Sequence, residues 1–406
     1  MMEKSERMAK SKEPRHSMKV SYLLETIVVM SIVAAQPLFA HEFEMELFTG
    51  GDTNPNELSA SFDVDTAPYG FARATLKHMP ARTGFYYKLD AKGSFYFADG
   101  DAVSNPKFAN ETRGEAVLGF KWRPRLKFGR ARFKWDVYTG GRDTSYVRKS
   151  TGQIARIPEN GTILEIPNRF DAAWFGVSTS GVVPISDEAD FLYDVYVEDK
   201  QYFEYTNVTS QSILDYQQSE IDIGFEKRIW PRTNLKTMIG AGVRIYQDRR
   251  AKEVDTGNDI PGTDLEFSFL EVENTLEYLI TDRWKWQFGL DIDQRKDNEE
   301  GYYDTTQGQL FMRFRYRNQN TVKFLLSMSY VKREYDNIDQ DPTLTDEELK
   351  EREGYRVRAE LSRAIFEQSR LSMDVVIGVE SNSYENSNPN FTYDQNRVYF
   401  GVRWHP

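Results

Sequence analysis

The stretch WKWQFGLDID, residues 284–293, alternates large apolar side chains with polar or small ones at every second position. Successive side chains of a β-strand point to opposite faces, so a period of two predicts a strand with one apolar and one polar face. The apolar face of this strand carries Trp284, Trp286, Phe288, Leu290 and Ile292.

The same alternation recurs along most of the chain, for example over residues 116–122, 191–197, 371–380 and 397–404. After residue 40 no stretch sustains a convincing amphipathic helix. The pattern predicts 16 strands, and Glu57–Val64 is an alternative to the first. Their ranges are 42–49, 69–78, 84–97, 114–122, 125–139, 169–182, 189–205, 213–229, 234–249, 265–279, 284–296, 306–317, 321–336, 354–366, 369–382 and 396–405.

The connections between these strands fall into two alternating classes, one short and one long and polar. Trp122, Trp230, Trp284 and Trp286 cluster at the short connections 123–124, 230–233 and 280–283. An antiparallel meander with its short turns at one end is typical of bacterial outer-membrane barrels, whose interfaces carry aromatic belts.

The composition excludes several classes of protein. Although 39% of the 406 residues are hydrophobic and 14% are aromatic, no apolar run beyond the N-terminus reaches the length of about 20 that a membrane helix needs. The net charge of −11 argues against binding nucleic acid through phosphates. With no Cys and four His, the chain has little material for a metal site, and we expect no cofactor.

Closing the meander into a barrel satisfies both faces of the strands. The apolar faces then contact lipid, the charged faces meet water inside, and no strand edge is left unpaired. The predicted fold class is all-β: a single transmembrane antiparallel up-and-down β-barrel of about 16 strands.

Residues 1–40 carry the features of a secretory signal peptide, with Met18 as an alternative start. Lys19 begins it, an apolar stretch follows through Ala35, and the cut falls after Ala40 or Ala35. We therefore expect a signal at 1–40 and the barrel at 41–406.

With these features the chain resembles Gram-negative outer-membrane β-barrels of the porin-like kind. The resemblance also rests on the final segment Tyr-Phe-Gly-Val-Arg-Trp, residues 399–404, since such barrels usually end in an aromatic residue; here His405-Pro406 follow. It implies a place in the outer membrane, contact with its lipids and lipopolysaccharide, and insertion by the barrel-assembly machinery.

Side-chain parity assigns the charges that point into the lumen. Basic residues gather on adjacent predicted strands, acidic ones on others, and we expect both groups to line the pore. They are Arg313, Arg315, Arg317, Lys323, Arg356 and Arg358, and Glu220, Asp222, Glu226, Glu271, Glu273 and Glu277. Such segregation predicts a transverse field across a wet pore. Arg397 and Arg403 on the last strand are instead expected to pair with Glu42, Glu44 and Glu46 on the first.

The sequence predicts no enzyme, because Gly-x-Ser-x-Gly is absent and no His stands beside a Ser or Asp pattern in a strand or long loop. The favoured hypothesis is a passive channel for hydrophilic solutes. Two alternatives are an export barrel for polysaccharide or a surface protein, and a closed structural or adhesive barrel.

Overall fold

The computed structural model describes residues 42–54, 66–97, 110–124, 130–145, 170–202, 214–318, 322–337, 352–368, 371–386 and 392–405, together with four short strands between 147 and 165. In this part of the chain every regular element is a β-strand, and no helix is long and apolar enough to cross a membrane.

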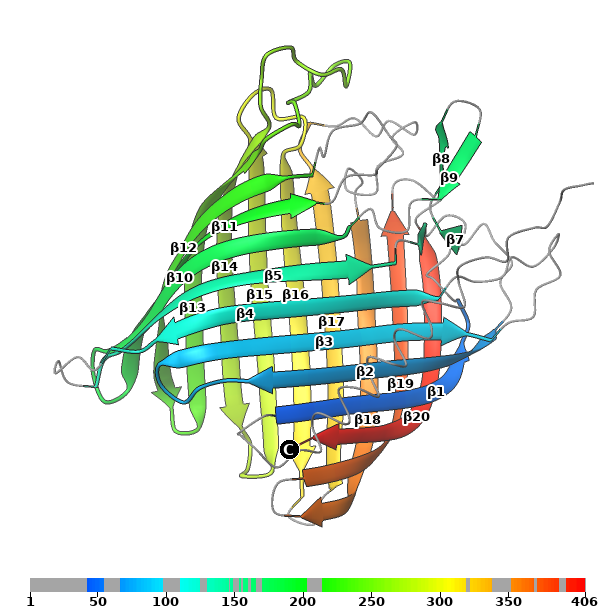
Figure 1. Ribbon diagram of the computed structural model, residues 1–406. Helices are drawn as coiled ribbons and strands as arrows, with labels where there is room; N and C mark the ends of the chain where they lie inside the picture. The colour runs from blue at the N-terminus through cyan, green and yellow to red at the C-terminus, as the bar shows by residue number, and fades with distance from the viewer. Residues whose placement is uncertain are drawn as a thin grey trace, which may run out of the picture.

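Sixteen strands form one closed barrel (Figure 1). Each strand pairs antiparallel with its neighbours in sequence, and the last strand pairs with the first. The barrel strands are β1 (Glu42–Asp52), β2 (Ala67–His78), β3 (Gly84–Tyr96), β4 (Glu111–Trp122), β5 (Arg132–Thr144), β10 (Ala172–Pro184), β11 (Ala189–Tyr202), β12 (Tyr216–Trp230), β13 (Thr233–Tyr246), β14 (Glu266–Leu279), β15 (Trp284–Asp297), β16 (Thr305–Arg317), β17 (Val322–Tyr335), β18 (Arg352–Gln368), β19 (Leu371–Asn386) and β20 (Tyr393–His405).

The long connection between β5 and β10 contains two small hairpins, β6 (Val147–Arg148) with β7 (Gln153–Ile154), and β8 (Arg156–Glu159) with β9 (Thr162–Glu165). Figure 1 shows β8 and β9 beyond the ends of the barrel strands. In the same view β1–β5 in front run at a steep inclination to β14–β17 behind, as the tilted strands of a closed barrel must.

The outer surface of the barrel is apolar. Ile221, Ile239, Ile292, Ile377 and Phe400 are between 41% and 59% exposed, although aliphatic and aromatic side chains of a water-soluble fold are normally buried. An apolar surface all around a barrel is favourable in the hydrocarbon region of a lipid bilayer and unfavourable in water. This surface therefore spans a membrane.

Aromatic side chains concentrate where the short connections join the strands. Trp122 and Trp135 are register partners on β4 and β5, and both are about half exposed. The ring of Trp284 lies 4.2 Å from that of Tyr316, centre to centre. These amphipathic rings suit the membrane interface, and the predicted belt at this end of the barrel is present.

The predicted strand number and order are confirmed, and most predicted bounds agree within a few residues. The fifth strand is the exception: the prediction was 125–139, and the structure has Arg132–Thr144. Leu126 and Phe128 stand at even positions, whereas Phe133 and Val137 stand at odd ones. A regular strand cannot change its phase, so β5 begins only after the change.

The connection 123–131 is consequently longer than the predicted 123–124, while the other short connections keep two to five residues. The predicted signal, residues 1–40, and the alternative first strand, Glu57–Val64, lie outside the described residues.

Candidate functional site: the barrel lumen

The register of the strands fixes which side chains share the inner face. On β15, Asp291 stands opposite Glu273 of β14 and Gln309 of β16, whereas the neighbouring Ile292 is outward and exposed. Continuing this pairing around the barrel places every predicted lumen charge on the inner face. Whether each lines an open pore stays a prediction.

Among the inner-face carboxylates of the adjacent strands β11–β15, seven lie in three neighbouring register rows, and we call these seven the acidic wall. They are Asp194, Glu220, Asp222, Glu271, Glu273, Asp291 and Asp293. Within the described residues none of them forms an ion pair with a Lys, Arg or His side chain. Like charges this close on one face repel each other, which favours water or a cationic solute beside them.

Glycines on β13 make room for the acidic wall. Gly240 lies between Asp222 and Glu271 in one register row, and a Cβ atom there would overlap the carboxylate of Asp222. Glu220 in the next row is held by the hydroxyl of Tyr196, which donates to it at 2.6 Å, and by Gln218 at 2.9 Å.

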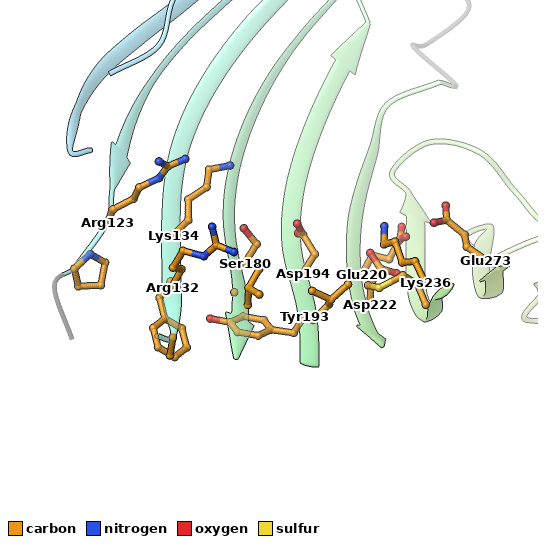
Figure 2. Close-up of a pocket in the computed structure, with 18 of the residues that line it drawn as sticks. Arg123, Arg132, Lys134, Ser180, Tyr193, Asp194, Glu220, Asp222, Lys236 and Glu273 are labelled. Atoms are coloured by element: carbon orange, nitrogen blue, oxygen red, sulfur yellow. The ribbon is translucent and has the colours of Figure 1, made fainter. Parts of the chain in front are cut away.

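A cavity of 920 Å³ extends from the acidic wall toward the short connections (Figure 2). Its opposite side carries Arg123, Arg132 and Lys134, which come from the β4 and β5 region. Lys134 forms an ion pair with Asp136 on its own strand. The cavity therefore has a basic and an acidic side, and no ion pair among the described residues joins the two sides.

Arg313, Arg315 and Arg317 form what we call the arginine ladder on β16. Arg313 stands opposite Gln287 and Ser327, and Arg315 stands opposite Lys285 and Leu325. Arg317 stands opposite Lys323. In the described part of the chain, the ladder has no acidic partner, and its role in the pore stays a prediction.

The other three predicted basic residues are neutralised locally. Lys323 lies 2.6 Å from Asp374, Arg356 lies 2.9 Å from Glu380, and Arg358 lies 2.6 Å from Glu360. The expected positive wall is therefore concentrated in the arginine ladder.

Among the predicted acidic residues, Glu277 is paired with Lys285 at 2.5 Å, and Glu226 stands opposite Lys236 in register. Both lie near the short connections. Glu220, Asp222, Glu271 and Glu273 belong to the acidic wall and line the cavity of 920 Å³.

The junction of the last and first strands is closed by ion pairs, as expected for Arg403, whose Nε lies 2.6 Å from Glu46. Arg397, however, pairs with Asp52 at 2.7 Å, and Glu42 and Glu44 both pair with Lys77 of β2. The expected pairing of Glu42 and Glu44 with the last strand was wrong because the antiparallel register brings Glu42 opposite Lys77 and β20 reaches only to Met45.

Sequence reasoning missed several inner-face charges. Asp194 and Asp293 share the parity of predicted lumen residues and could have been found by it. Arg73, Lys92 and Arg113 form one register row across β2, β3 and β4 and line a second cavity, of 700 Å³. Parity identifies each of these cations, but only the pairing places all three in one row.

A closed 16-stranded barrel with an apolar outer surface and a charged, hollow interior is a transmembrane β-barrel. No protein-family model matches the chain, and no curated protein matches it.

Solved structures with a similar fold include a BenF-like porin from Pseudomonas fluorescens Pf-5, with 10% identity, a TM-score of 0.44 and coverage of 91% of this chain and 100% of that one. Acinetobacter baumannii OccAB3 has 9% identity and a TM-score of 0.43 over 90% and 99% of the two chains. A bacterial polysaccharide outer membrane secretin has 8% identity and a TM-score of 0.40 over 90% and 97%. At these values the likeness identifies no family.

Proposed function

We propose that the protein is an outer-membrane channel through which hydrophilic solutes diffuse passively. The observation that carries this proposal is the contrast between the two faces of one closed sheet. The outer face is apolar, while the inner face carries charges that form no ion pair within the described residues, and it borders cavities of 920, 700 and 440 Å³.

A dry interior could not hold these charges. An unpaired carboxylate in a low-dielectric core costs several kcal/mol or changes its protonation, and the acidic wall has seven carboxylates without an ion pair in the described residues. Water in the lumen removes this cost. A barrel of 16 strands is wide enough for an aqueous channel.

The lumen is also divided by charge. The acidic wall occupies β11–β15, and the arginine ladder lies on the adjoining β16. Fixed charges act over about 10 Å at 0.1 M salt, so each group attracts oppositely charged solutes that pass near it. We infer that the channel selects by charge, with lipopolysaccharide and outer-membrane lipids around its apolar surface and the barrel-assembly machinery inserting it.

Planar-bilayer recording of the refolded protein tests the function directly. We expect stable conductance steps in potassium chloride that scale with salt concentration. The folded state is checked beforehand by a shift in gel mobility on boiling, since a closed barrel resists detergent until heated. A folded, inserted protein without conductance would contradict the proposal.

A further inference from the structure

Three inner-face aromatic rings each occupy the space over a glycine of the next strand. Tyr86 of β3 covers Gly119 of β4, and a Cβ atom on Gly119 would lie 2.5 Å from the Tyr86 ring. Trp174 of β10 covers Gly140 of β5 at the same distance. Tyr138 of β5 covers Gly176 of β10 in the same way. We call Tyr86, Tyr138 and Trp174 the aromatic floor.

The register makes the aromatic floor continuous. Tyr86, Gly119, Tyr138 and Gly176 follow one another in a single row across β3, β4, β5 and β10. Trp174 and Gly140 form the next row. Each glycine removes the side chain that would otherwise hold a ring away from the wall, so the rings lie close to the wall and border the lumen.

All three rings line one cavity of 440 Å³. This volume falls within the range of about 300–1,000 Å³ that is usual for small-molecule sites. The rings are partly exposed rather than packed into a core. A solute in the cavity can therefore contact them.

Charged groups that can donate and accept hydrogen bonds surround the aromatic floor. Asp136 is 5% exposed, and its Oδ1 atom is buried without a hydrogen-bond partner, although Oδ2 binds Lys134. Glu198 accepts a hydrogen bond from the hydroxyl of Tyr138 at 3.3 Å. Lys200 lies over the Trp174 ring, 5.6 Å from its centre, and Arg142 also lines the cavity.

We propose that this cavity binds the pyranose ring of a saccharide that passes through the channel, a step that rests on the function proposed above. A pyranose has a face of C–H bonds that stacks on aromatic rings and a rim of hydroxyl groups that both donate and accept hydrogen bonds. Asp136 and Glu198 accept from hydroxyl groups, and Lys200 and Arg142 donate to them. A buried acceptor such as Asp136 Oδ1 costs about 1–3 kcal/mol while unsatisfied, and a bound hydroxyl satisfies it.

A buried acceptor decides between a saccharide and an aromatic acid. The cavity lining holds four basic side chains beside three acidic ones, so its charge alone favours neither ligand. Asp136 Oδ1 lacks a hydrogen-bond partner and needs a donor, which a saccharide hydroxyl supplies and an ionised carboxylate does not.

Current block by added sugar tests the inference. With maltose as the probe, we expect a saturable decrease in the current of the wild-type channel. Trp174→Ala and Tyr138→Ala should each raise the half-blocking concentration about threefold to tenfold, the loss of one ring contact. Phe311→Ala is the matched control, because Phe311 of β16 covers Gly289 of β15 in the same way but lies outside the cavity.

The outcomes separate the two proposals. Two results would overturn the saccharide site and leave the channel proposal intact. One is a conducting channel whose current is not reduced by maltose. The other is a block by maltose that is as strong in all three variants as in the wild type. A stronger block by benzoate than by maltose, lost in Trp174→Ala, assigns the cavity to aromatic acids and also overturns it. If the folded protein does not conduct, the channel proposal fails. Binding at the aromatic floor is then still measured by the change in tryptophan fluorescence on adding maltose, a change that Trp174→Phe should abolish.

Discussion

The guanidinium of Arg403 on the last strand lies between two carboxylates, 2.6 Å from Glu46 on the first strand and 2.7 Å from Glu360 on β18. One side chain therefore joins three strands at the place where the barrel closes. Glu360 is 6% exposed and also pairs with Arg358, so the cluster is largely shielded from water.

Replacing Arg403 by Met should destabilise the closed barrel. The change removes the ion-pair partner of Glu46 and one of the two ion-pair partners of the buried Glu360. The loss should cost about 2 kcal/mol or more in stability. We expect the folded gel band to disappear at a lower temperature than in the wild type. Arg130→Met is the control, since Arg130 and Asp187 form a fully solvated pair, 80% and 91% exposed, that contributes little. Equal melting of the two variants would show that the closure does not depend on the Arg403 cluster.

The two faces of β15 should respond oppositely to a charge. Leu290→Arg places a cation toward lipid and should cost about 2–4 kcal/mol near the middle of the membrane. Asp291→Arg points into the lumen, beside Glu273, and should be tolerated. Urea titration of both variants in detergent or lipid, followed by tryptophan fluorescence, measures the difference. Greater damage from Asp291→Arg would reverse the assignment of the faces.

The acidic wall should set part of the ion preference. Changing Asp222 to Asn together with Glu271 and Glu273 to Gln removes three carboxylates that line the cavity of 920 Å³. With less negative charge in the lumen, the reversal potential in a potassium chloride gradient should move toward anion preference. Glu188→Gln, on an exposed short connection, is the control. A shift of the same size in both variants would mean that the wall is remote from the ion path.

Periodicity predicts the strands well because one rule, alternation, acts on every strand of a barrel. It fails where the phase changes, as it does before β5, since the apolar residues on both sides of the change look like one strand. Side-chain partners are harder to predict. Whether Arg397 binds Asp52 or Glu42 depends on the stagger between β20 and β1, which no local pattern contains.

The aromatic floor shows the same limit at the candidate site. Tyr86 and Gly119 are 33 positions apart, and nothing in either strand alone indicates that one lies over the other. Parity finds the residues of the inner face, but pairing decides which of them make a surface together.

The arginine ladder should oppose the effect of the acidic wall. Arg313, Arg315 and Arg317 have no acidic partner in the described residues, so their charge acts on ions in the lumen rather than on a neighbouring carboxylate. Changing all three to Gln should shift the reversal potential toward cation preference. No ion pair of the described residues is lost, so the barrel should melt as the wild type does.

Salt provides the check on this last prediction. A field from fixed charges is screened over about 10 Å at 0.1 M salt and about 3 Å at 1 M. The shift caused by the triple Gln variant should therefore be largest at low salt and shrink as the salt concentration rises. The double variant Arg356→Gln with Glu380→Gln is a matched control, because it removes both charges of one ion pair. It should leave the reversal potential nearly unchanged. An unchanged reversal potential in the triple variant at low salt would place the ladder away from the path of ions.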